Sequence, residues 1–257
     1  MKIFSWNDIL NFLDNGKEDA FFNQGCGISI GSFDGLHKGH KLLLNTLIVQ
    51  CEKENLLKGI VTFSKPLARI KHHNDYLGDV LTLEQRLKMF SELGIDFVII
   101  VDFDESFASM LGIDFLNLLI NVCNMKLIAE GIDFRCGFKG ATDFHSIKYF
   151  GKEKNIKTFF VEPVFYTNAI GEEERVSSSV IRMMISKGFF MIVENLLERP
   201  YQLVLNEKKL MIKKTSLKQV VPPKNIYHCK NEKNKDIRVE INDDNIILND
   251  EAEFLIF

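Results

Sequence analysis

The sequence predicts an α/β protein in which a parallel sheet with helices is followed by a small all-β region. Through the first two-thirds of the 257 residues, short apolar runs alternate with amphipathic stretches. Strands that alternate with helices require crossover connections, which place the strands parallel in one sheet. After Pro200 the helical periodicity ends, and short apolar runs alternate with polar turns. We therefore expect one domain over residues 1–199 and a small β domain over residues 200–257.

The elements of the first domain follow from the spacing of their apolar residues. A helix expected from about His40 places Leu43 and Leu47 on one face, and Thr82 can cap another helix. The apolar run over residues 97–101 is typical of a strand that is covered on both faces. The expected strands are residues 27–30, 59–63, 97–101, 126–129 and 158–161, and a further helix is expected over residues 115–123.

The C-terminal region contains only short strands by the same criteria. Polar turns such as residues 231–236 and 242–245 separate several of its apolar runs. The expected strands are residues 201–205, 210–213, 225–229, 237–241, 246–248 and 253–257.

Composition excludes several classes of protein. Hydrophobic residues make up 46% and charged residues 26%, as in an ordinary globular chain. A net charge of -3 and a pI of about 6.1 argue against nucleic-acid binding. No apolar run is long enough to cross a bilayer, and the N-terminus lacks the features of a secretory signal. Five scattered Cys residues without a Cys-x-x-Cys pair favour reduced thiols, so we expect a cytoplasmic protein with no membrane partner.

The most informative segment is the turn over residues 31–40, which reads GSFDGLHKGH. It joins a strand to a helix, and its glycines allow the backbone to approach a ligand closely. The start of the helix offers unpaired N–H groups and the positive end of the helix dipole. His37 and His40 are three residues apart there and can direct ring N–H groups to one anion. The segment therefore suits a polyphosphate.

Two other interpretations of this turn stay open on the residues alone. Two histidines at this spacing can bind a metal, with Asp34 as the only nearby candidate for a third ligand. The histidines can also be purely structural.

Two further segments are candidates for the same site. The serines before Ile181 are typical of a helix N-cap, and together with Arg182 they also suit phosphate. The loop over residues 130–140 follows a strand, and its glycines and aromatic residues can lie over a flat ring. Taken alone, a simple cap and an ordinary connecting loop are the favoured interpretations.

Together these segments resemble the adenylyltransferase half of the bacterial bifunctional riboflavin kinase/FMN adenylyltransferase family, also called FAD synthetases. The family motif Gly-x-Phe-Asp-Gly-x-His-x-Gly-His is complete over residues 31–40. Its later motif, Ile-Ser-Ser-Thr-x-x-Arg, is similar to residues 176–182, where Val176 and Ser179 are the differences. The resemblance covers about residues 27–201 and implies a Rossmann-like nucleotidylyltransferase domain.

The sequence departs from the family pattern, most of all after the second strand and in the C-terminal region. The family usually carries Pro-His-Pro after its second strand, where residues 61–67 read VTFSKPL. Residues 201–257 contain no match to Gly-Arg-x-x-Gly-x-Pro-Thr-Ala-Asn, the nucleotide-binding segment of the family's kinase barrel, although residues 221–227 resemble a later strand of that barrel. We expect this region to be a degenerate barrel, the remnant of a riboflavin kinase domain without kinase activity.

The resemblance implies a protein that makes FAD and pyrophosphate from FMN and ATP. It assigns His37 and His40 to the ATP phosphates, and Arg182 to the β- and γ-phosphates and the leaving group. The other implied ATP-binding residues are Gly31, Phe33, Asp34, Gly39, Ser178 and Ser179, and the flavin-binding candidates are Asp133 and Phe134. Mg²⁺ is expected to arrive with ATP, without a dedicated set of protein ligands.

Two other functions remain open at this point. The chain can be an adenylyltransferase for another phosphorylated substrate, because a fold does not determine its substrate. It can also be a flavin or nucleotide sensor that binds without catalysis. The sequence predicts no oligomeric state.

Overall fold

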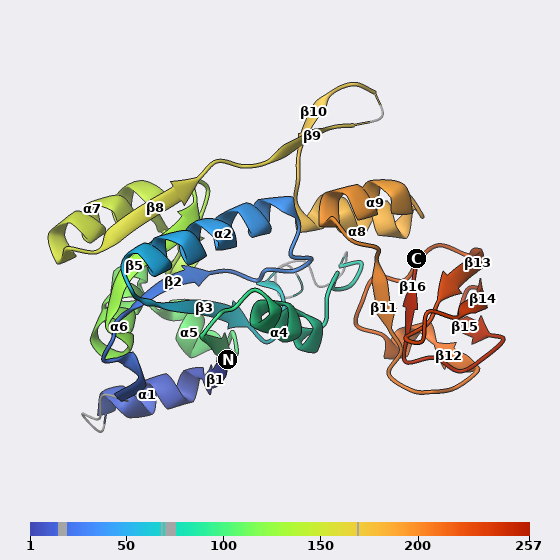
Figure 1. Cartoon of the computed structure of the whole chain (residues 1–257), viewed down its shortest axis with the longest axis horizontal. Coiled ribbons are helices and arrows are strands. Elements are labelled where there is room, and N and C mark those ends of the chain that lie inside the picture. The colour runs from blue at the N-terminus through green and yellow to red at the C-terminus, as the bar shows by residue number, and fades with distance from the viewer. Residues whose placement is uncertain (15–19, 68, 70–75, 169) are drawn as a thin grey trace. The chain divides into compact units, whose positions relative to one another are not determined.

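The structure is a computed structural model that describes residues 1–14, 20–67, 69, 76–168 and 170–257 (Figure 1). Its contacts divide the chain into two compact units, and neither unit is continuous in sequence. The first contains Met1–Phe33, Gly39–Leu67 and Leu87–Val164, and the second contains Asp34–Lys38, Ala68–Arg86 and Phe165–Phe257. The expected boundary between residues 199 and 200 falls inside the second unit, because it follows a change in sequence pattern, whereas the units follow contacts.

The first unit is built on a six-stranded parallel sheet with the order β1-β4-β3-β2-β5-β8. Its strands are β1 (Lys2–Ser5), β2 (Cys26–Ile30), β3 (Leu57–Phe63), β4 (Phe97–Val101), β5 (Met125–Gly131) and β8 (Lys157–Val161). The prediction of a parallel α/β sheet and of five of these strands is confirmed. The edge strand β1 was not predicted, because its four residues show no alternation that distinguishes them from a loop.

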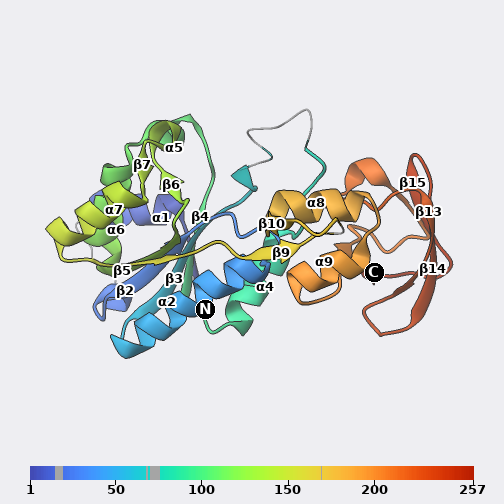
Figure 2. The same ribbon diagram turned by 90° about the horizontal axis from the view of Figure 1, so that it is seen from above.

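Helices cover both faces of this sheet (Figure 2). On one face lie α2 (Lys38–Lys53) and α4 (Leu83–Glu92), and on the other lie α1 (Trp6–Asp14), α5 (Glu105–Ser109), α6 (Gly112–Cys123) and α7 (Phe144–Lys154). The apolar face predicted for α2 is buried, including Leu43 and Leu47. The predicted cap of α4 is also confirmed: the hydroxyl of Thr82 accepts from the backbone N–H of Gln85, whose side chain accepts from the N–H of Thr82.

The second unit contains two helices, a hairpin and a sheet. The helices are α8 (Ser178–Ser186) and α9 (Phe190–Leu197), and β9 (Phe165–Thr167) pairs with β10 (Glu173–Arg175). The antiparallel sheet has the order β11-β16-β13-β14-β15-β12, with strands β11 (Gln202–Val204), β12 (Met211–Lys213), β13 (Asn225–Lys230), β14 (Asp236–Ile241), β15 (Asn245–Leu248) and β16 (Phe254–Ile256). The predicted all-β region and its six strands are confirmed.

Smaller elements complete the described chain. They are the strands β6 (Arg135–Cys136) and β7 (Thr142–Asp143) and the 3-10 turns η1 (Ala20–Phe22), η2 (Phe138–Gly140) and η3 (Lys214–Ser216). Among the helices within the described ranges, none combines the length and the apolar character that crossing a bilayer requires.

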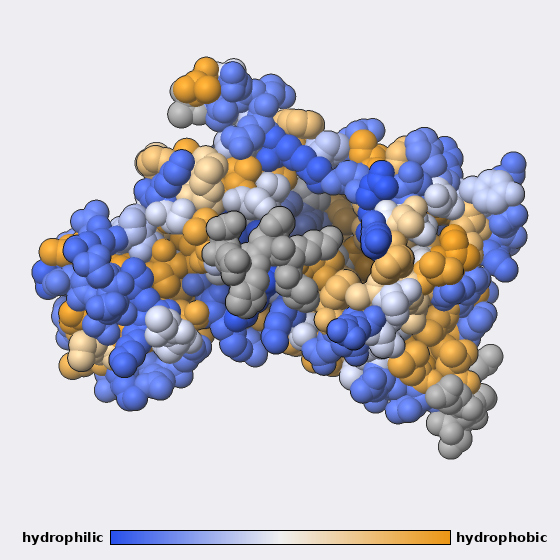
Figure 3. All heavy atoms as spheres, turned by 180° about the vertical axis from the view of Figure 1, so that it is seen from behind, coloured by the Kyte–Doolittle hydropathy of each residue, from blue (hydrophilic) through white to orange (hydrophobic). Residues whose placement is uncertain are grey.

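The β9–β10 hairpin was not predicted from the sequence. Its surface is mostly hydrophilic with an apolar spot at its far end (Figure 3), where Ile170 is 77% exposed. The return strand ends at Arg175, and Ser177 follows as the N-cap of α8. The hairpin therefore places Arg175 two residues before the N-cap of α8.

Candidate phosphate-binding site

The candidate site begins where the order of the parallel sheet reverses. From β2 the chain continues to β3 on one side, whereas the neighbour on the other side is β5, which comes later in sequence. Ligands of open α/β sheets bind at such a point, beyond the carboxyl ends of the strands. Two segments singled out from the sequence, the turn over residues 31–40 and the loop over residues 130–140, follow these two strands.

Glu130 joins the ends of β2 and β5. Its Oε1 accepts a 2.6 Å hydrogen bond from the backbone N–H of Ile30, the last residue before the turn. The side chain is 1% exposed, and burial raises the pKa of its carboxyl well above the ordinary value. Glu130 thus fixes the strand end from which the turn departs. The only sequence signal for this role is an acidic residue at the end of an apolar strand.

The turn itself has an unusual backbone. Gly35 has φ of +94°, and the two non-glycine residues Phe33 and Leu36 have φ of +48° and +44°. Residues other than glycine rarely adopt a positive φ, which costs about 1–3 kcal/mol for each such residue. Phe33 and Leu36 are 1% and 0% exposed, so their burial holds the turn in this conformation.

Phe33 supports the second histidine of the motif. Its ring packs edge-on against His40 at a centroid distance of 5.3 Å and against Phe90 at 5.7 Å. A Cβ atom on Gly31 would lie 3.3 Å from the Phe33 ring, so the glycine leaves room for it. His40 lies in the first turn of α2, and the buried ring of Phe33 packs against its imidazole.

Asp34 brings the first motif together with the serine–arginine motif. Its carboxylate accepts hydrogen bonds from the backbone N–H groups of Val80 and Leu81, at 2.9 Å each to Oδ1. Its Oδ2 lies 2.5 Å from Nη2 of Arg182, and the Ser178 hydroxyl donates to its backbone carbonyl. Asp34 is 1% exposed, so these protein groups surround it. Its geometry is that of a residue that positions Arg182.

The guanidinium of Arg182 is buried and has a hydrogen-bond donor that the described residues do not use. It is 6% exposed, and its Nε has no hydrogen-bond partner among the residues that the structure describes. The ring of Tyr76 lies 5.0 Å from the guanidinium carbon, in a cation–π contact. A buried donor that lacks a partner is costly, and a bound anion would satisfy it.

His37 lies among cationic groups of the second unit. Burial, followed by the charges of Arg175, Arg199 and Arg182, lowers the pKa of His37 to about 3. Its imidazole is therefore neutral at pH 7 and donates through one ring nitrogen only. Of the three guanidinium groups, that of Arg182 pairs with the carboxylate of Asp34. The charges of these arginines would favour an anion beside His37.

Arg199 also holds the turn in place. Its Nη2 donates to the Gly35 carbonyl at 2.7 Å and its Nη1 to the Leu197 carbonyl at 3.1 Å. Burial lowers the pKa of Arg199 to about 10, so it remains charged at pH 7. Arg175, Arg199 and Tyr76 were not predicted as site residues. Arg175 directly precedes the motif over residues 176–182, and Arg199 is the last residue of the expected first domain; these positions are the only sequence signals for them.

The other predicted residues are divided between the two units. The predicted N-cap of α8 is confirmed, because the Ser177 hydroxyl accepts from the N–H of Val180 at 3.3 Å. Asp133 is exposed, whereas Phe134 is half-buried and packs against the core of the first unit. The first unit holds Gly31, Phe33, Gly39, His40, Asp133 and Phe134, and the second holds Asp34, His37, Ser178, Ser179 and Arg182.

The alternative of a metal site finds no support in these positions. In the described ranges no group of three or more His, Cys, Asp or Glu side chains is placed to hold a metal ion. Asp34, the candidate third ligand, faces Arg182 instead. All five cysteines are free thiols.

The fold and the site define an α/β protein with a strand–turn–helix segment after β2 and, in its second unit, a buried arginine that is paired with Asp34. A family model described as FAD synthetase matches residues 20–180. The chain therefore belongs to the FAD synthetase family, as its motifs predict.

Three curated relatives illustrate the match. A bifunctional riboflavin kinase/FMN adenylyltransferase of Buchnera aphidicola subsp. Schizaphis graminum is 30% identical over 70% of this chain and 57% of the relative. The protein of the same description from Escherichia coli K12 is 28% identical over 69% and 56%. An FAD synthetase of Listeria monocytogenes is 28% identical over 68% and 69%. The chain matches a little over half the length of the bifunctional relatives.

One solved structure shows the same fold over most of the chain. The crystal structure described as a macrolide-efflux protein from Streptococcus pneumoniae superposes with a TM-score of 0.72 at 18% identity. The superposition covers 91% of this chain and 84% of the other. At this identity the likeness concerns the fold alone.

Proposed function

We propose that this chain is an FMN adenylyltransferase, which joins the AMP part of ATP to FMN and releases pyrophosphate. The observation that carries the proposal is the buried Arg182 guanidinium, whose Nε has no hydrogen-bond partner among the described residues, in a chain of the FAD synthetase family. A complete Gly-x-Phe-Asp-Gly-x-His-x-Gly-His motif after β2 supports it.

The proposed reaction needs positioning more than acid–base chemistry. An oxygen of the FMN phosphate forms a bond to the α-phosphorus of ATP. The bond between that phosphorus and the oxygen that bridges it to the β-phosphorus breaks, and pyrophosphate leaves. The nucleophile is already an anion, so no side chain has to remove a proton from it. Catalysis then depends on in-line geometry and on stabilising the charge of the departing pyrophosphate. ATP enters as its magnesium complex, and the ion is part of the substrate.

We assign the leaving pyrophosphate to Arg182, Ser178 and Ser179. Asp34 directs the Arg182 guanidinium, and the free Nε supplies one donor for a phosphate oxygen. His37 and His40 are assigned to the ATP phosphates, and Gly31, Phe33 and Gly39 to the shape of the turn around the nucleotide. Asp133 and Phe134 are assigned to the flavin side.

We also propose that residues 201–257 carry no riboflavin kinase activity. They form a six-stranded antiparallel sheet, but they contain no copy of the segment with which the family's kinase barrel holds nucleotide. FMN must then come from another protein. A cytoplasmic location, supported by five free thiols, and the absence of a nucleic-acid partner, supported by the acidic pI of about 6.1, belong to the same proposal.

Turnover of defined substrates tests the proposal. We expect purified protein with ATP, Mg²⁺ and FMN to yield FAD and pyrophosphate in equal amounts. With riboflavin in place of FMN, we expect no FMN, and its appearance would contradict the assignment of the C-terminal sheet. Binding of FMN or ATP without product would favour a sensor, and turnover of a different phosphorylated acceptor would favour another adenylyltransferase.

His40→Ala tests the role of the motif histidine. We expect the rate of adenylyl transfer to fall by roughly 10²-fold or more, as when other charge-stabilising donors are removed. His228→Ala on exposed strand β13 is the matched control and should retain the wild-type rate. An unchanged kcat in His40→Ala would contradict the assignment.

A further inference from the structure

The C-terminal sheet contacts the segment that positions the phosphate site. Residues 76–81, here called the bridging segment, lie between Asp34 on one side and the C-terminal part of the chain on the other, all within the second unit. Asp79 forms an isolated parallel bridge with Gln219: its N–H donates to the Lys218 carbonyl at 2.8 Å, and its carbonyl accepts from the Val220 N–H at 2.9 Å.

Gln219 fastens this bridge with its side chain. It is 4% exposed, and its Nε2 donates to the carbonyls of Val80 and Gln202 at 2.9 Å each. Its Oε1 accepts from the N–H of Val204 at 2.9 Å. One amide therefore connects the bridging segment to strand β11. All its polar atoms are used, as a buried amide requires.

A glycine marks the closest approach of the two segments. Gly78 has φ of +118°, and a Cβ atom there would lie 2.7 Å from the backbone carbon of Gln219 and 2.7 Å from the nitrogen of Val220. The bridging segment and the loop that carries Gln219 are therefore in direct backbone contact, with no room for a side chain at this point.

The other side of the bridging segment faces the candidate site. Val80 and Leu81 donate their N–H groups to the carboxylate of Asp34, which holds Arg182. Tyr76 stacks on the Arg182 guanidinium, and its hydroxyl donates to Asp79 at 2.7 Å. A displacement of this segment would thus move both the carboxylate and the aromatic ring that orient Arg182.

We propose that the C-terminal sheet acts as a positioning element for the phosphate site, through Gln219 and the bridging segment, and that Gln219 is a positioning residue for Arg182. The inference rests on the proposed function, because it takes Arg182 as a ligand of the ATP phosphates. It gives the sheet a task in adenylyl transfer that needs no kinase chemistry.

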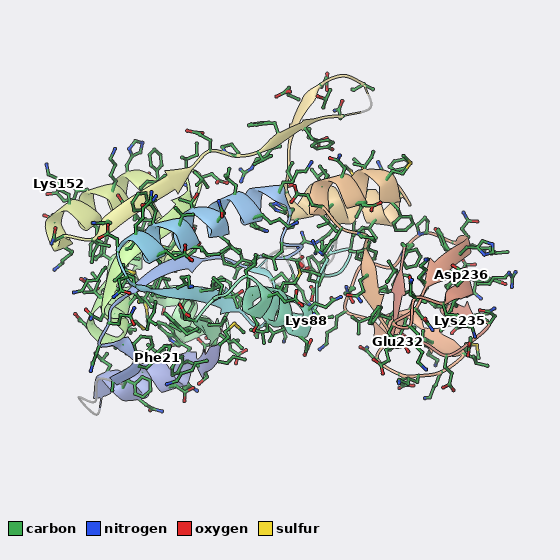
Figure 4. All side chains as sticks on the ribbon, in the orientation of Figure 1. Phe21, Lys88, Lys152, Glu232, Lys235 and Asp236 are labelled. Atoms are coloured by element: carbon green, nitrogen blue, oxygen red, sulfur yellow. The ribbon has the colours of Figure 1, made fainter. Side chains whose placement is uncertain are left out.

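Three variants of the full chain test this. Gln219→Met keeps the side-chain length and removes the three hydrogen bonds, and Gly78→Ala separates the two segments. Tyr201→Phe removes one hydroxyl, whose 2.7 Å bond to the Val220 carbonyl anchors the same loop, and it leaves the core packing intact. Asp236→Asn, at the start of β14 and labelled in Figure 4, is the control on the same sheet.

The readouts are the Kd for inorganic pyrophosphate by calorimetry and the KM for ATP in FAD formation. We expect Gln219→Met and Gly78→Ala to weaken both by about tenfold, because small displacements of phosphate ligands are costly. Tyr201→Phe should move both in the same direction by a smaller factor, and Asp236→Asn should leave both unchanged. Should the first two variants fail to fold, Tyr201→Phe alone decides between a positioning and a merely structural role.

A double-mutant cycle shows whether the effect passes through Arg182. In an Arg182→Met background, Gln219→Met should not weaken pyrophosphate binding further. Lowered melting temperatures with unchanged Kd and KM, or an additive effect in the cycle, would overturn the inference. So would a wild-type protein that binds no pyrophosphate. A wild type that binds pyrophosphate but makes no FAD would refute the proposed function and leave this test intact.

Discussion

The protonation state of His37 provides a direct test of the electrostatics of the candidate site. Burial and the charges of Arg175, Arg199 and Arg182 lower its pKa to about 3, against about 6.5 in an unfolded chain. Between pH 6.5 and pH 3 the unfolded chain therefore binds one proton more at this position than the folded protein. Stability must fall as the pH falls through this window, and the contribution is constant above it.

The size of the effect follows from these two pKa values. Between pH 7 and pH 5 the unfolded imidazole goes from about one-quarter protonated to almost fully protonated, while the folded one takes up almost no proton. Integration of the linkage relation gives a loss of about 2 kcal/mol of unfolding free energy over these two pH units. His37→Gln removes the group, so the variant should lose about 2 kcal/mol less than the wild type over the same interval.

Urea denaturation at pH 7 and pH 5 measures this difference, with His228→Gln as the control because His228 lies exposed on β13. In NMR titrations the ring resonances that disappear in His37→Gln should not shift between pH 8 and pH 5. Saturating pyrophosphate should raise the pKa of His37, since bound negative charge favours the imidazolium. A His37 that titrates near pH 6.5 in the free protein would refute the described cluster of guanidinium groups.

Two further predictions concern the buried groups of each unit. Asp34→Asn leaves the Arg182 guanidinium buried without its carboxylate, so we expect denaturation to show a loss of about 3–5 kcal/mol in unfolding free energy. We also expect a raised KM for ATP in FAD formation, and a variant as stable as the wild type would contradict the ion pair. Gly59→Ala would place a Cβ atom 2.1 Å from the Phe97 ring, so we expect the unfolding free energy of the first unit to fall by about 1–3 kcal/mol. An unchanged melting curve would show that β3 and β4 are not packed as described.

The fold was predictable because it depends on local patterns. The predicted strands of both regions lie where apolar runs are bounded by turn residues, and the caps at Thr82 and Ser177 follow from side chains that bond to the nearby backbone. The hairpin β9–β10 was missed because each strand has only three residues and no apolar alternation. The helices α1 and α9 were not predicted, although each has an apolar face that is visible in the sequence.

The site was only partly predictable because its key contacts join residues far apart in sequence. The two motifs could be recognised, yet the ion pair between Asp34 and Arg182 spans 148 residues, and no pattern specifies it. The proximity of Arg175 and Arg199 to His37 depends in the same way on tertiary structure. Sequence spacing therefore identified candidate residues for phosphate binding, whereas the partners that orient them or shift their pKa values came only from the fold.

The contacts of Asp34 explain why an acidic residue can stand in a turn that is proposed to bind phosphate. A carboxylate beside a polyphosphate would repel it, so an aspartate at this position requires a reason other than contact with the nucleotide. Asp34 accepts hydrogen bonds from Val80, Leu81 and Arg182, and each of these bonds fixes a group of the protein. The hydrogen-bonding capacity of the Asp34 carboxylate is thus taken up by groups of the protein, which explains an acidic residue in this turn without any contact to a nucleotide.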